Sequence, residues 1–148
     1  MHSWSVLDIS GSFYAMAMSS LGEIFRPGTI TRVPAMHTAV LGYANRRGDP
    51  IAIIDPVKLL GIPGKPCEPG PHLMAVSMVG TDIAIVIDRA VDVTRAEPQR
   101  VTDHHQAIVW NESFIAIIDA SSLRDALQQL RLEARLFPLP ITRTQVTP

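Results

Sequence analysis

Short apolar segments, separated by glycine and proline, run along most of the chain. Within these segments isoleucine and valine recur with a period of two, as in half-buried β-strands. Twelve prolines and nine glycines keep the segments short. The pattern therefore predicts a mostly β protein built from many short strands.

One strand-like segment occurs twice with an identical sequence. Residues Ile51–Asp55 reappear as Ile115–Asp119, and a close variant, Ile83–Asp88, lies between them. Each copy follows a turn-like cluster, so we expect each to be the second arm of a hairpin. Their nearly continuous apolar character predicts burial on both faces. The segments between the copies are dissimilar, which favours two small related sheets or barrels over a solenoid.

A helix is expected after each identical copy. Asp55 can act as an N-cap, Pro56 suits the first helical position and Gly61 can close a short turn. A longer helix is expected to begin at Asp119 and Ser121. Its apolar stripe, and the prolines that end it, are Leu123, Ala126, Leu127, Leu130, Ala134, Pro138 and Pro140.

The length of 148 residues, 47% of them hydrophobic, suffices for one ordinary core. We expect a single domain over residues 1–140 that contains two β subdomains. The densest proline and glycine punctuation, around residues 61–72, predicts a connector between the two halves. Residues 141–148 are expected to form a flexible tail.

The charge pattern excludes several function classes. Thirteen basic and fourteen acidic residues give a net charge of -1, without the basic face that a nucleic-acid binder needs. Apolar runs such as Ile83–Ile87 are far shorter than the roughly twenty residues of a membrane span. The first residues show no secretory signal, so we expect a cytoplasmic protein without membrane insertion.

Candidate catalytic and metal-binding groups are sparse. The single cysteine, Cys67, excludes an internal disulfide and a multi-cysteine zinc site. The stretch Gly61–Lys65 is too short for a phosphate loop, and Pro66 follows where a magnesium ligand would stand. His104 and His105 are adjacent, so an extended chain would point them to opposite faces. We therefore expect no catalytic residue, no metal and no cofactor.

The sharpest polar element is the turn-like run Asn45-Arg46-Arg47-Gly48. Gly48 can adopt a positive φ in a tight hairpin, and the two arginines are expected to project to opposite faces. The run is either a solvated turn or a turn whose arginine offers a planar donor fork to a partner protein.

The order and spacing of several motifs resemble the CheW family of chemotaxis coupling proteins, over nearly the whole chain. The most specific short motif is Gly-x-x-Asn-Arg-Arg-Gly at 42–48, which resembles the family's Gly-x-x-Asn-Leu-Arg-Gly run. The other matching segments are Ser5–Met18, Leu21–Ile24, Thr31–Pro34, Ile51–Asp55, Leu59–Gly61, Leu73–Gly80, Ile83–Asp88 with Val91 and Val93, and Phe114–Leu130.

This resemblance implies a fold of two intertwined five-stranded, SH3-like β-barrels with a short helix and a C-terminal helix. It also implies a non-enzymatic adaptor that couples methyl-accepting chemoreceptors to a CheA-type histidine kinase. The implied partners are the cytoplasmic tip of the receptor and the kinase's regulatory domain, at receptor arrays beneath the inner membrane. The receptor would lie in an apolar groove between the lobes.

The resemblance also assigns partner-binding residues by position. Arg47 matches the family arginine associated with partner binding, and we expect it to be the polar anchor. Asn45 and Gly48 would shape its turn, while Glu23 and Gly42 match other residues of that region.

The chain departs from the family pattern at five places. Arg46 replaces the usual leucine of the signature, His37 replaces a proline, Ala52 replaces a strand proline and Pro56 replaces a leucine. The expected loop at residues 99–107 is also short. Two alternatives stay open: a CheW-like scaffold of a pathway for surface motility or development, and a small-ligand-binding β-barrel.

Overall fold

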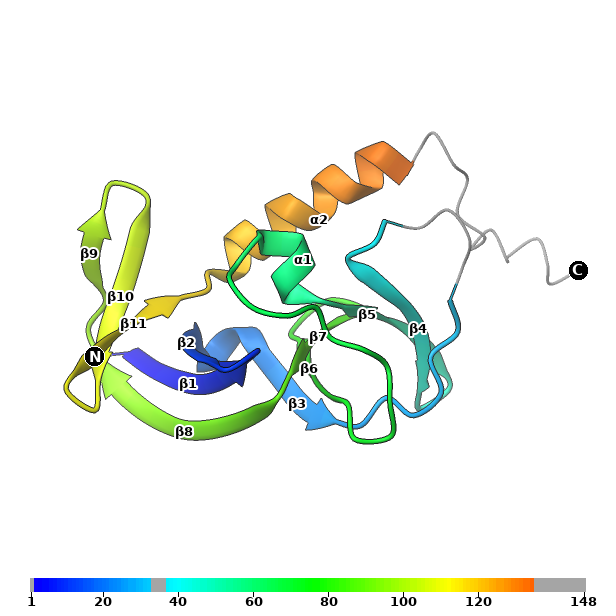
Figure 1. Cartoon of the computed structure of the whole chain (residues 1–148), viewed down its shortest axis with the longest axis horizontal. Coiled ribbons are helices and arrows are strands. Elements are labelled where there is room, and N and C mark those ends of the chain that lie inside the picture. The colour runs from blue at the N-terminus through cyan, green and yellow to red at the C-terminus, as the bar shows by residue number, and fades with distance from the viewer. Residues whose placement is uncertain (1, 33–36, 135–148) are drawn as a thin grey trace, which may run out of the picture.

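The strands form two sheets, and the first sheet is built from both ends of the chain (Figure 1). This computed structural model describes residues 2–32 and 37–134, with side chains described up to residue 129. In spatial order, the first sheet consists of β8 (Arg89–Ala96), β1 (His2–Ile9), β2 (Ser12–Ala17), β11 (Ser113–Ile117), β10 (His105–Trp110) and β9 (Gln99–Thr102). The second consists of β3 (Leu21–Phe25), β6 (Met74–Met78), β7 (Ile83–Ile87), β5 (Asp49–Ile54) and β4 (Val40–Arg46).

Three short or terminal elements complete the described chain: the 3-10 helix η1 (Met18–Ser20), α1 (Pro56–Leu60) and α2 (Ala120–Ala134). Most neighbouring strands are antiparallel, but β2 pairs with β11, and β5 with β7, in parallel. The prediction of a mostly β protein is therefore confirmed. Each repeated segment is also the second arm of a hairpin, as expected, since β5, β7 and β11 follow β4, β6 and β10.

The first sheet has six strands, one more than the resemblance implied. The additional strand comes from residues 99–107, where we expected only a loop. Gln99 and Arg100 pair with Ala107 and Gln106, so β9 and β10 form a hairpin. The loop expectation was wrong because this segment is polar, and all four residues of β9 are exposed. The hairpin projects from the end of the molecule (Figure 1).

The core consists of one central cluster between the sheets and a smaller cluster within each sheet. The central cluster takes apolar side chains from β1 and β2 on one side and from β6 and β7 on the other, and both helices cover it. In α2, Leu123 is fully buried and Leu127 packs against the cluster. In Figure 1, α2 starts near the end of β11, between the two sheets, and runs above α1 toward the β5–β4 side of the second sheet.

The two identical copies lie in different environments. In β5, Ile51, Ile53 and Ile54 are buried, as the apolar pattern predicted. In β11 the same sequence alternates, with Ile115 buried but Ala116 exposed. The prediction of two-sided burial was therefore wrong for the second copy. One face of β11 packs on the first sheet's own cluster, while the other is left open beside the exposed Phe114.

Both helix starts agree with the capping signals. Asp55 accepts a hydrogen bond from the backbone N–H of Val57 at 2.9 Å, and Gly61 closes α1 with a φ of 68°. Asp119 accepts from the N–H of Ser121 at 3.1 Å at the start of α2. The prolines expected to end this helix, the tail at 141–148 and Pro34 of the Thr31–Pro34 motif lie outside the described residues.

The proline-rich stretch 61–72 contains no helix or strand. It joins α1 to β6, and the strands on either side, β5 and β6, belong to the second sheet. The stretch thus runs within one part of the fold and does not lead from one sheet to the other. Its middle lies against the β1–β2 turn, where the Ser10 hydroxyl accepts from the N–H of Lys65 at 2.6 Å.

Candidate partner-binding site

The run Asn45-Arg46-Arg47-Gly48 forms the tight turn between β4 and β5. Arg46 pairs with Asp49, which leaves Arg47 and Gly48 as the two loop residues. Both have positive φ, 54° and 89°, as the twist of a two-residue hairpin requires. The Asn45 side-chain oxygen accepts a hydrogen bond from the Gly48 N–H at 2.8 Å. The structure therefore assigns Asn45 and Gly48 the turn geometry that we expected of them.

Both arginines of the turn bind the same carboxylate, that of Glu23 on β3. Nη2 of Arg47 donates to Oε1 and Oε2 of Glu23 at 3.1 and 3.0 Å. Nη2 of Arg46 lies 2.5 Å from Oε1. The expectation that the arginines point to opposite faces was wrong, because Arg47 has left the extended conformation on which such alternation depends.

The two arginines differ in their surroundings. The guanidinium of Arg46 also lies over the ring of Phe25, 4.9 Å from its centroid, and only 23% of the Arg46 side chain is exposed. Its Nε is buried without a hydrogen-bond partner among the described residues. The Arg47 side chain is 75% exposed. Arg46 is thus packed into the site, while Arg47 covers it from the solvent side.

The two guanidinium groups stabilise the charged form of Glu23. The pKa of the Glu23 carboxyl is lowered from its ordinary value, chiefly by the hydrogen bond from Arg46, with a smaller effect of the charge and hydrogen bond of Arg47. The carboxylate therefore stays ionised at neutral pH. Two further acidic residues, Asp49 and Asp82, line the depression beside the turn together with both arginines.

The cluster also joins the two edges of the second sheet. Strands β3 and β4 are the outer strands of that sheet, where β3 pairs with β6 and β4 pairs with β5. Glu23 and Phe25, two residues apart on β3, contact Arg46 at the end of β4. These contacts connect edges that no backbone ladder joins in the described part of the chain.

Gly42 takes no part in this cluster. Its φ is 146°, and a Cβ at this position would collide with the backbone of Thr31. That close approach is needed because Thr31 and Tyr43 exchange two backbone hydrogen bonds, of 2.8 and 2.9 Å. The geometry therefore explains Gly42 by backbone packing.

A shallow depression of about 530 Å³ lies beside the turn. It is lined by Arg46, Arg47, Asp49, Pro50, Ile51, Thr81 and Asp82. A partner side chain can therefore reach Arg47 without displacing any strand.

Sequence reasoning named Glu23 and Arg47 but did not place them together. It described Arg46 as one of two arginines that project from the turn and as a departure from the family pattern, and it did not mention Phe25. The signal that was available is the two-residue spacing of Glu23 and Phe25, which puts both side chains on one face of a strand. The meeting of that strand with the turn depends on tertiary structure.

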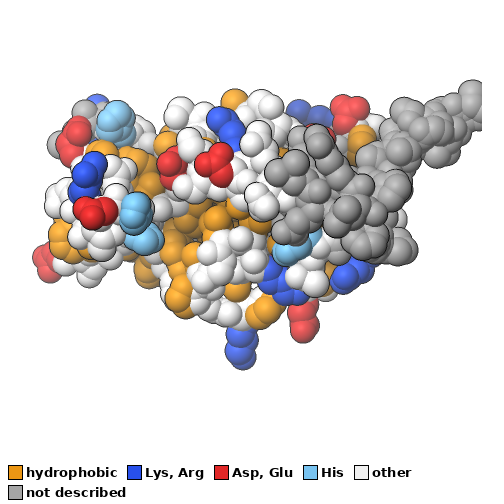
Figure 2. Space-filling view, turned by 90° about the horizontal axis from the view of Figure 1, so that it is seen from above, with side chains coloured by type: hydrophobic (Ala, Val, Ile, Leu, Met, Phe, Trp, Pro, Cys, Tyr) orange, Lys and Arg blue, Asp and Glu red, His pale blue; other side chains and the backbone are white. Residues whose placement is uncertain are grey.

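The other candidate groups do not assemble into a chemical site. Thr102 and His105 are hydrogen bonded at 2.9 Å, and no group of three or more possible metal ligands occurs within residues 2–32 and 37–134. Viewed from above, apolar side chains show at the floor of an open hollow beside the histidine-bearing end of the molecule (Figure 2). Its polar rim includes both signs of charge, on Arg100 and Asp103.

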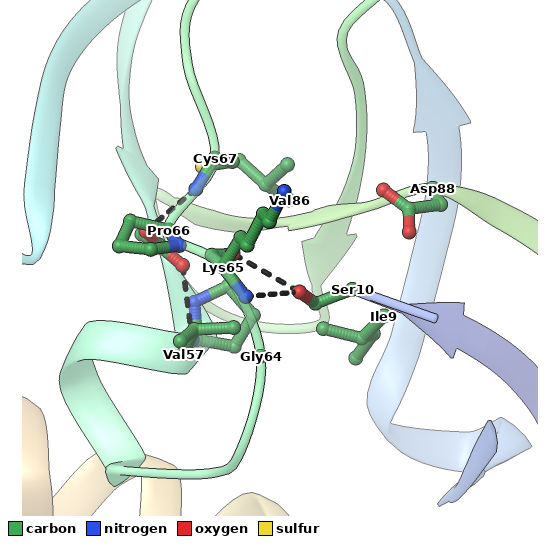
Figure 3. A pocket seen from close by; sticks show the side chains of 11 residues that line it. Ile9, Ser10, Val57, Gly64, Lys65, Pro66, Cys67, Val86 and Asp88 are labelled. Atoms are coloured by element: carbon green, nitrogen blue, oxygen red, sulfur yellow. Dashed lines mark hydrogen bonds between the residues drawn. The ribbon is translucent and has the colours of Figure 1, made fainter. Parts of the chain in front are cut away.

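Gly64 and Lys65, at the end of the Gly61–Lys65 stretch, line a second pocket, of about 480 Å³. The Lys65 N–H, which a phosphate would need, already donates to Ser10, and Ser10 donates back to the Lys65 carbonyl at 3.0 Å (Figure 3). Asp55 binds the N–H groups of Val57 and Cys67 in the same pocket. The backbone here is held by the protein itself, which argues against a phosphate loop.

Within the described ranges, no helix is both long enough and apolar enough to cross a membrane.

A model of the CheW-like domain matches residues 4–127 of the chain. The chain therefore belongs to the family of proteins with a CheW-like domain. Among solved structures, it resembles the scaffolding protein TtCheW from Thermoanaerobacter tengcongensis, with a TM-score of 0.65 and 18% identity over 79% of this chain and 88% of that one. No curated protein matches it significantly. The likeness to TtCheW shows that the two share a fold, and the resemblance inferred from the motifs is confirmed.

Proposed function

We propose that the protein is a cytoplasmic adaptor that couples chemoreceptors to a CheA-type histidine kinase and performs no chemistry itself. Family membership over residues 4–127 supports a scaffold or adaptor role in a chemotaxis system. The partners proposed within that role are the cytoplasmic tip of a receptor and the regulatory domain of the kinase.

The main observation in support of this site is that Arg47 is exposed while its backbone is held in one conformation. Its backbone is held in a two-residue turn by Asn45 and Gly48, and its side chain is 75% exposed. A guanidinium presented in this way is accessible to a partner and can donate two parallel hydrogen bonds. We propose Arg47 as the anchor, Asn45 and Gly48 as its turn, Glu23 as its acceptor in the unbound protein and Gly42 as backbone support.

The test is co-sedimentation of the purified protein with a receptor cytoplasmic fragment and the CheA-type kinase of the same cell. Wild type is compared with Arg47→Ala and with Arg89→Ala. Arg89 is the matched control, since it is a 62% exposed arginine that also pairs with a carboxylate, that of Asp8, but lies on the first sheet.

Assembly by wild type and Arg89→Ala, with loss of assembly by Arg47→Ala and an unchanged melting temperature, is the expected result. Absence of binding by wild type at concentrations well above micromolar would refute the coupling role in that pathway. Equal binding by Arg47→Ala would refute the anchor and leave the adaptor role standing.

A further inference from the structure

Two arginines share a single carboxylate at the β4–β5 turn, and they do so unequally. Arg46 binds one oxygen of Glu23 from a half-buried position against Phe25, whereas Arg47 reaches both oxygens from the solvent side. If Arg47 swings away, Glu23 keeps a guanidinium partner. Without Arg46, the departure of Arg47 would leave Glu23 with no guanidinium partner among the described residues.

Arg46 is poorly placed to meet a partner itself. Its guanidinium face lies on the Phe25 ring at 4.9 Å, and one edge is taken by Glu23. Its Nε is buried, so this third donor does not face solvent. Only the more exposed Arg47 can exchange its present acceptor for one on another protein.

We propose that Arg46 is a positioning residue that holds the Glu23 carboxylate, so that Arg47 can leave Glu23 and bind a carboxylate on the partner protein. The inference rests on the proposed function, because it describes how the anchor is released. A partner carboxylate fits because a guanidinium binds carboxylates with two parallel hydrogen bonds. Each carboxylate, that of Glu23 and that of the partner, then has its own arginine.

The arrangement can be tested first without a partner. NMR titration of the Glu23 side-chain carboxyl is compared in wild type, Arg46→Met and Arg47→Met. Methionine keeps a long apolar side chain that can cover Phe25 while removing the charge. The Glu23 pKa is expected to rise more in Arg46→Met than in Arg47→Met. The reverse order would overturn the inference, since Arg47 would then be the main holder of Glu23.

The second arm measures the dissociation constant for the receptor fragment or the kinase regulatory domain. Arg46→Met is expected to weaken binding by about two- to fivefold, the range of one exposed ion pair. In a Glu23→Gln background the same substitution is expected to change the constant by less than about 1.5-fold, because no charge remains to be held.

An unchanged dissociation constant in Arg46→Met would overturn the inference. So would an equal loss in both backgrounds, which would mean that Arg46 contacts the partner directly. If Arg47→Met weakens binding while Arg46→Met does not, the proposed function stands and only the inference fails. If wild type binds neither partner, the proposed function fails, and the release of Arg47 to a partner fails with it.

Discussion

The carboxylate of Asp55 binds the backbone N–H of Cys67, twelve residues further along the chain, at 3.1 Å. Its other oxygen caps α1. One side chain thus fixes both the start of a helix and the proline-rich stretch that follows it. Asp55 is only 1% exposed, so water cannot replace these bonds in the folded protein.

Removal of this carboxylate is expected to destabilise the fold much more than removal of its counterpart in the second copy. Asp55→Ala loses a cap and also leaves the half-buried N–H of Cys67 unpaired, which together cost about 2–4 kcal/mol. Asp119→Ala, at an exposed cap with the same preceding sequence, costs about 1 kcal/mol. Urea unfolding of both variants measures the difference, and equal losses would contradict the role assigned to Asp55.

The thiol of Cys67 is expected to be unreactive in the folded protein. Burial, and secondarily the charge of Asp55, raises its pKa to about 12, so the thiolate that attacks labelling reagents is scarce at neutral pH. At pH 8 the labelling rate of native protein should be at least about a hundredfold below that of the urea-unfolded chain. Similar rates in the two states would show that the thiol is freely accessible.

The same raised pKa predicts a loss of stability at alkaline pH. The unfolded thiol loses its proton at a pKa of about 8.5, while the folded thiol keeps it up to about 12. The folded state therefore binds more protons in this window, and the free energy of unfolding should fall as pH rises through it. Cys67→Ala is expected to flatten that dependence. The comparison requires unfolding curves at several pH values between these limits.

Gly42 and Gly48 are expected to respond differently to alanine, although both have positive φ. At Gly42 a Cβ would collide with the Thr31 backbone, so Gly42→Ala should cost about 2 kcal/mol or more. At Gly48 nothing lies within 4 Å of such a Cβ, and only backbone strain of about 1 kcal/mol is expected. Thermal melts that rank Gly48→Ala as the more damaging change would refute this account of Gly42.

The ion pairs of Glu23 predict a small effect of pH on stability, and its sign is opposite to that predicted for Cys67. Because the Glu23 pKa is lowered in the folded state, its stabilising contribution is present at neutral pH and is lost as pH falls through that lowered value. The difference in melting temperature between wild type and Glu23→Gln should therefore disappear in acid. A difference that persists at the lowest pH would show that Glu23 acts through packing.

The parts of the fold that depend on neighbours in sequence were predictable. Asp55, Pro56 and Gly61 specify the ends of α1 within seven residues, and Gly48 specifies the hairpin turn. These signals depend on local hydrogen bonds and allowed φ values, which the amino-acid type alone determines.

The parts of the fold that depend on tertiary contacts could not be predicted from the sequence. The identical segments in β5 and β11 differ in burial because one lies inside the second sheet and the other faces an open side of the first. Glu23 and Arg46 are 23 residues apart in the sequence, and they meet only because the tertiary fold brings the two edge strands of the second sheet, β3 and β4, together. No local pattern in the sequence contains that information.

The path of the chain through the two sheets has a consequence for synthesis. All strands of the second sheet, β3 to β7, leave the ribosome before β8 begins, whereas the first sheet needs residues from both ends of the chain. The second sheet, with its arginine turn, can therefore form while translation continues. The hairpin of β1 and β2 emerges first but must wait for β8 and β11, the last partners to be made.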